Sequence, residues 1–243
     1  MDRVAVAFSG GADSAFLLKA MKDALGRGNV LAVTVRSEFS TGAEIRGAAR
    51  LAKSLGIKHA VITAKLLSDP KIRANTPLRC YYCKKKIFSL VRKEALKRGY
   101  RVVVDASNID DRKDYRPGRL ALKELGIFSP LEDAGMTKAR IRVLSKMAGL
   151  PTWNKPADAC LATRIPYGEK ITRGNLEMAE RAEDIIRRDI GAGQLRVRVH
   201  GDLARIEVPK ERVKKALALG SKTIKGLHAL GFRHITIDTE GYR

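Results

Sequence analysis

Short apolar runs alternate with amphipathic segments through the first half of the chain. The runs are rich in valine, isoleucine and alanine, which is typical of buried strands, and the segments between them repeat apolar residues at helical spacing. In chain order we predict strand 3–8, helix 14–25, strand 30–35, helix 43–55, strand 59–63, helix 84–98 and strand 101–106. This alternation predicts an α/β fold in which a parallel sheet carries helices on both faces.

The pattern changes in the second half of the chain. Thr137 is expected to cap a helix that ends near residue 148, because a glycine and a proline follow at once. Residues 151–170 are irregular and rich in proline. After them we predict helix 175–188, strands 195–200 and 203–208, a helix opened by Pro209, helix 222–230 and strand 233–238. We therefore expect a first domain at 1–155 and a small C-terminal α+β domain at 156–243.

The first predicted strand runs directly into residues 9–14, which read SGGADS. Glycines allow the backbone to approach a ligand closely, and the helix that follows points free N–H groups at an anion. The two serine hydroxyls add donors, and Asp13 is suited to hold magnesium on the phosphates. The Walker motif is absent. These features predict a nucleotide-phosphate loop, and a plain strand–turn–helix corner is the alternative.

Composition adds a strong positive charge. Lysine and arginine number 48 against 26 aspartate and glutamate residues, which gives a net charge of +22. Such a field attracts both nucleotides and RNA. The basic residues are scattered and aromatic residues are few, so we interpret the charge mainly as a solvated surface with phosphate pockets. With no apolar run of membrane-spanning length and no signal peptide, a cytoplasmic location is expected.

The chain contains three cysteines, Cys80, Cys83 and Cys160, and an odd number cannot pair completely. Taken alone, the Cys80-x-x-Cys83 spacing is compatible with half a zinc site, a redox pair or a coincidence. The four histidines show no ligand-type spacing. Three thiolates together can hold a [4Fe–4S] cluster whose fourth iron stays open to an external ligand.

Seven further blocks of sequence complete the set of motifs: NTP at 75–77, DYRPG at 114–118, WNKP at 153–156, RIPYG at 164–168, RVRVH at 196–200, ARIE at 204–207 and LGFR at 230–233. With the SGGADS loop they resemble the LarE family of sulfur transferases, within the PP-loop ATP pyrophosphatases, over essentially the whole chain. The resemblance implies an adenine-nucleotide alpha hydrolase-like fold, a homo-oligomer, and the use of ATP with Mg²⁺. Family members adenylate a carboxylate of pyridinium-3,5-biscarboxylic acid mononucleotide and replace the activated oxygen with sulfur, in nickel-pincer nucleotide biosynthesis.

The source of the sulfur divides the family into two branches. In one branch a cysteine at the position of Cys160 gives up its own sulfur and becomes dehydroalanine. In the other branch three cysteines hold an iron–sulfur cluster that delivers sulfide from a sulfur donor. This chain departs from the first branch because it also has Cys80 and Cys83. The resemblance therefore favours the cluster, with sacrificial use of Cys160 as the alternative.

The resemblance also assigns site residues by matched position. Catalytic roles fall to Cys160, Asp13 and Lys84, and the cluster ligands are Cys80, Cys83 and Cys160. The predicted nucleotide-binding residues are Ser9, Gly10, Gly11, Asp13, Ser14, Arg36, Ser37, Asp105 and Asn108. The predicted substrate-binding residues are Arg164, Glu183, Arg196, Arg198 and Arg233, with the last three as a phosphate clamp. Asp114 and Arg116 are expected in a loop over the nucleotide.

Two other functions remain open. A tRNA thiolation enzyme would share the ATP loop and the cluster, and the net charge favours it. Against it, no added RNA-binding or zinc module is visible in the sequence. An ATP-sensing scaffold without catalysis is the third interpretation, which the three cysteines make less attractive.

Overall fold

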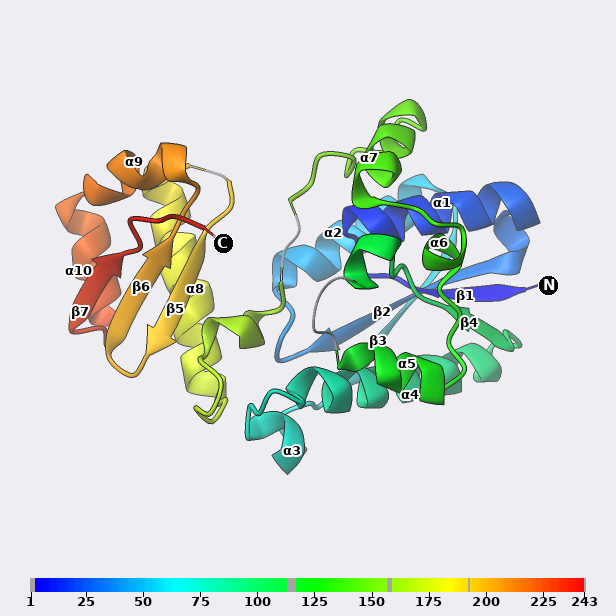
Figure 1. Ribbon diagram of the computed structural model, residues 1–243, viewed down its shortest axis with the longest axis horizontal. Coiled ribbons are helices and arrows are strands. Elements are labelled where there is room, and N and C mark those ends of the chain that lie inside the picture. Colours follow the sequence, from blue (N-terminus) through cyan, green and yellow to red (C-terminus); the bar gives the residue numbers. More distant parts are fainter. Residues whose placement is uncertain (1–2, 113–116, 157–158, 192, 243) are drawn as a thin grey trace. The chain divides into compact units, whose positions relative to one another are not determined.

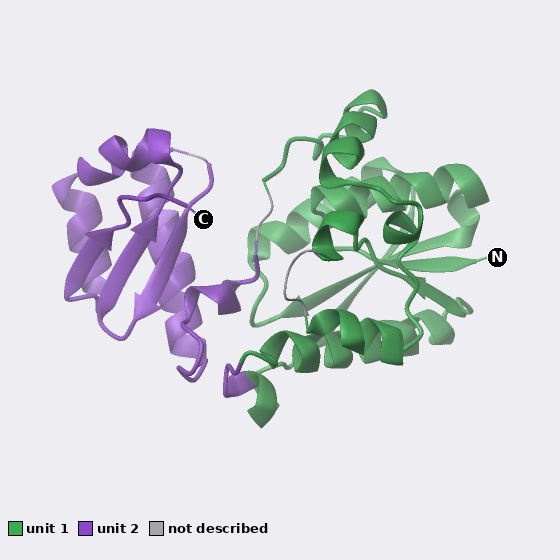
Figure 2. Cartoon of the chain, viewed as in Figure 1, with its two compact units in different colours: residues 1–72, 77–157 green, residues 73–76, 158–243 purple. Residues whose placement is uncertain are grey.

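The computed structural model describes residues 3–112, 117–156, 159–191 and 193–242 (Figure 1). The chain forms two compact units (Figure 2). The first unit comprises residues 1–72 and 77–157, and the second comprises residues 73–76 and 158–243. Four residues from the first half of the chain thus belong to the second unit, which the sequence pattern does not indicate.

The first unit is built on a sheet of four parallel strands within its described residues. In sequence order they are β1 (Val4–Ala7), β2 (Val30–Ser37), β3 (Lys58–Ala64) and β4 (Val102–Val104), and their spatial order is β3-β2-β1-β4. Strand β1 lies inside the sheet and carries no polar side chain, as expected for a strand covered on both faces. The parallel α/β prediction is confirmed.

Helices cover both faces of this sheet, as predicted (Figure 1). The helices of one face are α1 (Ala12–Leu25), α2 (Gly42–Ser54) and α7 (Lys138–Met147), and they pack on the side of β1 that carries Val4 and Val6. The helices of the other face are α4 (Arg79–Lys97) and α5 (Gly118–Glu124), which pack on the side that carries Ala5. Alternate residues of a strand point to opposite faces, so one short strand supports two cores.

The predicted helix 84–98 is wrong at its start, because α4 begins at Arg79 and includes Cys80 and Cys83. The N-cap residue is Leu78, whose side chain makes no capping bond, so no residue type in the sequence marks this start. Thr137 does cap α7, since its hydroxyl accepts a bond from the Arg140 N–H. Short helices that the sequence pattern did not predict are α3 (Pro70–Arg73), α6 (Pro130–Asp133), η1 (Arg27–Asn29) and η2 (Ile109–Arg112).

The second unit is the small α+β arrangement that the sequence pattern predicted. Its elements are η3 (Leu161–Arg164), α8 (Arg173–Ile190), β5 (Arg196–His200), β6 (Leu203–Glu207), η4 (Lys210–Arg212), α9 (Val213–Leu217), α10 (Ser221–Ala229) and β7 (His234–Ile237). In its described residues the strands have the order β5-β6-β7, with β5 antiparallel and β7 parallel to β6. Pro209 does not open a helix as predicted, because it caps the 3-10 turn η4 with extended backbone.

The two faces of the second sheet differ in character. Val197 and Val199 of β5 are buried with Ile186 of α8, which forms the core of the unit. The alternate positions of β5 carry Arg196 and His200 at intermediate exposure. We call this side of the sheet, with Arg196, Arg198 and His200, its basic face. None of the described helices has the length and apolar character needed to cross a membrane.

Candidate functional site

The predicted phosphate loop joins the end of β1 to the start of α1. Gly10 has φ of +74°, and a Cβ atom there would lie 3.0 Å from the Ala48 Cα, so the loop requires glycine at this position. The hydroxyls of Ser9 and Ser14 lie 3.1 Å apart, and Ser14 also donates to the Gly11 carbonyl. Helix α1 therefore presents its first N–H groups and two hydroxyls at the carboxyl edge of the sheet, an arrangement suited to phosphate oxygens.

Asp13 lies at this edge beside residues from the end of β4. The Asn108 amide donates to the Asp13 carboxylate at 3.0 Å, which brings two of the predicted residues together. Burial raises the pKa of Asp13, and the charge of Asp111 raises this pKa further. The Asp111 carboxylate is itself buried, and Lys138 lies 3.1 Å from it at the start of α7. Asp111 and Lys138 were not predicted as site residues. Asp111 reaches this edge only through the conformation of the 3-10 turn η2, which the sequence pattern does not show.

The pair of carboxylates, Asp13 and Asp111, has the chemistry that Mg²⁺ prefers. Both offer hard oxygen ligands, and two like charges at a half-buried edge are stabilised when a cation joins them. Among the described residues no group of three or more histidine, cysteine or acidic side chains is close enough to form a protein-only metal cage. A magnesium site with two carboxylates is consistent with this, since Mg²⁺ commonly shares its remaining positions with water and phosphate.

Lys84 and Asp105 are also close to each other. Lys84 Nζ lies 3.9 Å from Asp105 Oδ2, and its alkyl chain passes under Gly118, where a Cβ atom would be 2.7 Å from Lys84 Cδ. The buried Asp105 carboxylate accepts bonds from Ser107 and Ser129 as well. Lys84 therefore points to the ligand edge of the sheet, rather than lying on the outer, solvated face of α4.

Arg36 and Ser37 lie at the end of β2, and their predicted role in nucleotide binding stays a prediction. Ser37 accepts a bond from the Phe39 N–H and pairs with the Ser40 hydroxyl, so it stabilises a local turn. Arg36 is exposed at the end of β2. Asp114 and Arg116 lie outside the described residues.

A lysine that the sequence analysis did not select reaches the phosphate loop. Lys155 Nζ donates to the Gly10 carbonyl at 3.2 Å, and Arg142 bonds the Lys155 carbonyl. The sequence offered one indication of this lysine, since Lys155 belongs to the WNKP block at 153–156, which was matched to the family. Lys155 adds a positive charge where nucleotide phosphates would lie.

Two of the three cysteines are neighbours on one helix. Cys80 and Cys83 lie three residues apart in the first turns of α4, so both face the same side at intermediate exposure. The buried Arg79 side chain contacts Cys80 Sγ at 3.8 Å. Cys160 belongs to the second unit, where it is exposed and caps η3. The convergence of all three thiols therefore stays a prediction.

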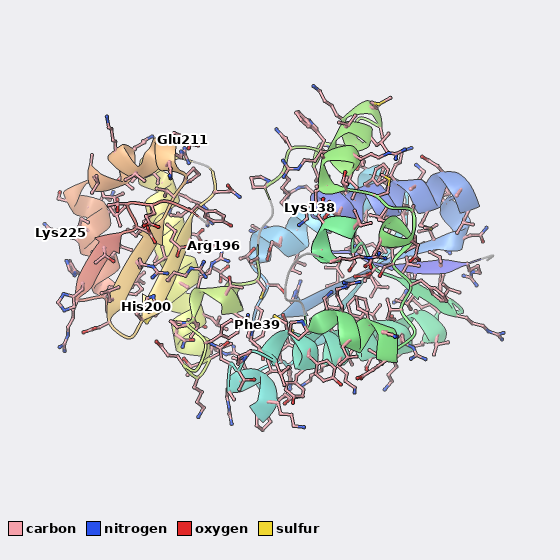
Figure 3. The ribbon with its side chains drawn as sticks, in the orientation of Figure 1. Phe39, Lys138, Arg196, His200, Glu211 and Lys225 are labelled. Carbon is pink, nitrogen blue, oxygen red and sulfur yellow. The ribbon has the colours of Figure 1, made fainter. Side chains whose placement is uncertain are left out.

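The basic face of the second sheet carries two of the three predicted phosphate arginines, Arg196 and Arg198 of β5, and Figure 3 labels Arg196. Arg198 makes a two-bond pair with Glu207 at 2.9 Å for each bond, and Arg205 shares the same carboxylate. Arg196 stacks on the Tyr242 ring at 4.3 Å, and its buried Nε has no hydrogen-bond partner among the described atoms. Burial lowers the pKa of Arg196, so an arriving anion would relieve the cost of holding this charge. Arg196 is thus the group on this face best placed to receive a phosphate.

His200 lies on the same face and was not predicted as a site residue (Figure 3). Its buried Nε2 atom has no hydrogen-bond partner within the described part of the chain. Burial lowers the pKa of the imidazole, and Arg205 lowers this pKa further. The neutral ring therefore remains available as a donor to an anion on this face.

Arg164 and Glu183 lie inside the second unit, and their predicted substrate-binding role stays a prediction. They are both buried and make a two-bond pair with each other, at 2.7 and 3.2 Å. Glu183 also accepts from Arg187 and from the Val197 N–H, so its carboxylate is fully engaged. Arg164 donates to the Ala159 and Cys160 carbonyls. The pair fixes the backbone that carries Cys160, because a buried charge must be matched by a buried partner.

Arg233 does not join the arginine clamp. It precedes β7, is highly exposed, and lies 3.7 Å from the Asp202 carboxylate. The register pairs Arg205 with Thr236, so position 233 has the parity of Ile235 and belongs to the opposite side of the sheet from Arg196 and Arg198. The register therefore groups Arg205, rather than Arg233, with Arg196 and Arg198, and a phosphate clamp on this face stays a prediction.

Comparison with known proteins identifies relatives over the entire length of the chain. Residues 1–103 match the family model described as NAD synthase. The chain is 40% identical over 243 residues to pyridinium-3,5-bisthiocarboxylic acid mononucleotide synthase of Lactiplantibacillus plantarum, covering 100% of this chain and 88% of that protein. It is 39% identical over 246 residues to an uncharacterized protein of Synechocystis sp., covering 100% and 91%. A third relative, an uncharacterized protein of Methanocaldococcus jannaschii, is 30% identical over 241 residues, covering 99% and 91%. The chain therefore belongs to the LarE family of ATP-dependent synthases, with an NAD synthase-like PP-loop domain at its N-terminus.

Proposed function

We propose that this protein adenylates a carboxylate of pyridinium-3,5-biscarboxylic acid mononucleotide and replaces the activated oxygen with sulfur, releasing AMP and pyrophosphate. The observation that carries the proposal is the 40% identity, over the full chain, to a relative named for the bisthiocarboxylic acid product. The SGGADS loop lies inside the matched region and supplies the ATP chemistry.

Adenylation solves a specific chemical problem. A carboxylate resists attack because its charge repels a nucleophile and oxide is a poor leaving group. Adenylation removes the charge of the carboxylate, and the departing oxygen then leaves as part of AMP. The residues of the first unit are suited to hold ATP for this step: the α1 N-terminus and Lys155 around the phosphates, and Lys84 at the same sheet edge. Magnesium on Asp13 and Asp111 would neutralise phosphate charge while pyrophosphate departs.

The second unit would hold the substrate by its phosphate. Arg196 offers a guanidinium whose Nε has no partner among the described residues, and Arg198 and Arg205 surround one carboxylate, Glu207. The face therefore carries an excess of positive charge that suits a single phosphate. Its small extent fits a mononucleotide better than a polynucleotide backbone.

For the sulfur step we infer that Cys80, Cys83 and Cys160 hold a [4Fe–4S] cluster. Cys80 and Cys83 already share one helix side, and the Arg79 side chain lies 3.8 Å from Cys80 Sγ. A cluster on three cysteines would supply sulfur that is already deprotonated, so this chain need not provide a general base. Sacrifice of the Cys160 sulfur is the competing route.

An anaerobic single-turnover assay tests the proposal. The protein is mixed with ATP, Mg²⁺, the biscarboxylate mononucleotide and sulfide, and the products are analysed by mass spectrometry. We expect AMP, pyrophosphate and a product in which sulfur has replaced a carboxylate oxygen. A protein containing iron and acid-labile sulfide, with Cys160 unchanged in mass after turnover, supports the cluster. Loss of hydrogen sulfide mass at Cys160 contradicts it, and release of AMP without any thiocarboxylate contradicts the proposed reaction.

The net charge of +22 favours one second candidate, tRNA thiolation. Filter binding of tRNA at two salt concentrations separates the two functions. Tight binding that weakens steeply with salt would indicate contacts to many phosphates and would support the tRNA enzyme. Weak binding, with turnover of the mononucleotide, supports the proposed function.

A further inference from the structure

Asn75 has a backbone conformation that only glycines share in the described part of the chain. Its φ is +54°, in the left-handed region, and its side chain is completely buried. Asparagine enters this region more readily than most residues, yet the conformation persists only where surrounding contacts hold it. A buried, strained asparagine outside the two binding faces therefore needs a reason.

Four hydrogen bonds join Asn75 to the segment that follows Cys160. The side-chain amide donates to three carbonyls, those of Ile165 at 3.3 Å, Pro166 at 2.6 Å and Glu169 at 3.0 Å. The backbone carbonyl of Asn75 accepts from the Gly168 N–H at 3.1 Å. A further bond joins residue 171 to residue 73, so the 73–76 segment is held firmly to the second unit.

We call the hydrogen bonds of residues 73–76 to residues 165–171 the anchor, and the path of the chain shows which segments it holds. The chain leaves the first unit after residue 72 and returns to it at residue 77, two residues before α4 begins. Cys80 follows Asn75 by five residues, a stretch that spans at most about 18 Å when fully extended. Cys160 precedes Ile165, an Asn75 partner, by five residues that include the short helix η3. Asn75 thus lies five residues before Cys80 along the chain and is hydrogen-bonded to the segment that follows Cys160.

We propose that Asn75 is a positioning residue for the cysteine set. By locking residues 73–76 into the second unit, it keeps Cys80 and Cys83 on a short tether from the segment that carries Cys160. The inference rests on the proposed function, in which the three thiols act together. Asparagine is required by chemistry: glycine keeps the backbone conformation but loses three hydrogen bonds, and aspartate would place an oxygen against three carbonyl oxygens.

Thiol cross-linking of the full-length, cluster-free protein tests the inference directly. A short bifunctional thiol reagent is added, and peptide mapping measures the bridge between Cys160 and either Cys80 or Cys83. We expect efficient bridging in the unchanged protein and a rate about tenfold lower in Asn75→Gly, since the thiols then meet less often. No bridging in the unchanged protein, or equal bridging in Asn75→Gly, overturns the inference.

The matched control is Asn175→Ala. Asn175 belongs to the same unit and makes the capping box of α8 with Thr172, and its hydrogen bonds go to Thr172 and Lys170 rather than to residues 73–76. The substitution destabilises the unit without releasing the anchor, so its bridging rate should stay unchanged. Equal loss of bridging in both variants would reduce Asn75 to a general stability effect and overturn the inference. ATP-dependent protection of the first unit checks that each variant is folded, and Asn75→Ser, whose hydroxyl can still donate one hydrogen bond, replaces Asn75→Gly if the latter does not fold.

Iron content separates this inference from the proposed cluster. Iron that is never retained contradicts the cluster, whereas bridging that is fast in the unchanged protein and slow in Asn75→Gly still supports the role of Asn75. Where the cluster does form, Asn75→Gly should lose iron and form the thiocarboxylate about 10- to 100-fold more slowly, while AMP release is preserved. Loss of AMP release in step with thiocarboxylate would instead indicate a damaged first unit and overturn the positioning role.

Discussion

Single residues in this protein are placed where their charge is costly. Asp13 is held at the sheet edge against burial and against Asp111, and both effects raise its pKa. Arg164 is buried and depends on Glu183 for its neutralisation. Such charged groups are of two kinds. Some are neutralised by an oppositely charged residue of the chain, and others are proposed to be neutralised by a bound ligand.

Asp13 is of the second kind, so Asp13→Asn should raise the melting temperature of the ligand-free protein at neutral pH. Because the folded pKa lies above 3.8, ionised Asp13 destabilises the fold as pH rises through that range. The gain should therefore vanish at low pH, where the carboxyl group is protonated in both states. The variant should lose about 100- to 1000-fold in pyrophosphate release. Calorimetry with and without Mg²⁺ checks this, and a Mg²⁺-induced rise in melting temperature that survives in the variant would remove Asp13 from the metal site.

Glu183 is of the first kind, and Glu183→Ala should destabilise the protein by about 3–5 kcal/mol, because it leaves Arg164 buried without its carboxylate. Its neighbour provides the control. Asp184 is exposed and pairs only loosely with Arg187 at 3.4 Å, so Asp184→Ala should change stability by about 0.5 kcal/mol or less. Urea unfolding measures both. Similar values for the two variants would mean that the Arg164 pair is not buried in solution.

These residues also mark what sequence can and cannot predict. The SGGADS loop is local, so its conformation followed from the residues themselves. Asp111 and Lys155 reach the same edge from distant loops; the WNKP block drew attention to the segment of Lys155, but no local pattern indicates where either side chain lies. The pairing of Arg164 with Glu183 was not predicted, because a charged residue looks the same in a sequence whether or not another residue neutralises it.

Elements were predicted best where periodicity and caps agree. Helix α2 is capped by Thr41 with a complete capping box, and its predicted and observed starts differ by one residue. Helix α4 lacks a capping side chain, and its start was misplaced by five residues, which hid the cysteines inside it. The strand pattern on β5 was clear. The side of the sheet to which Arg233 belongs depends instead on the register between β6 and β7, which the sequence pattern does not give.

Gly47 offers a test of helix packing. It lies within α2, and a Cβ atom added there would meet no other atom within 4 Å, so Gly47→Ala should stabilise the protein by about 0.5–1 kcal/mol through helix propensity. Urea unfolding measures this effect, and a loss of stability would mean that the position is packed in solution.

Gly118 starts α5 directly over Lys84, and Gly118→Ala should displace that lysine and slow adenylation. An AMP-release assay measures this effect. Normal AMP release in Gly118→Ala would contradict a role for Lys84 at the nucleotide.

At the scale of the whole molecule, each of the two units has its own core and its own groups proposed to bind anions. The first unit buries its sheet between two helical layers and offers the α1 N-terminus. The second unit buries one face of its sheet and leaves Arg196 and Arg198 on the other. Ligands that stabilise the native state should therefore act on different units.

Hydrogen exchange provides the measurement. Mg²⁺·ATP should slow exchange at the start of α1 and in the turn before α7, where Asp111 and Lys138 lie, and should leave β5 unchanged. Sulfate, as a mimic of the substrate phosphate, should slow exchange in β5 and β6 and leave α1 unchanged. Sulfate protection confined to α1 would show that the arginine face of the second unit is not the phosphate site.

The affinity for sulfate should also depend on pH. The pKa of His200 is lowered from 6.5, and a bound anion favours the protonated imidazole, so sulfate should bind more tightly as pH falls below 6.5, by at most about tenfold per pH unit. Titration calorimetry at several pH values measures this, and binding independent of pH would show that His200 does not contact the anion.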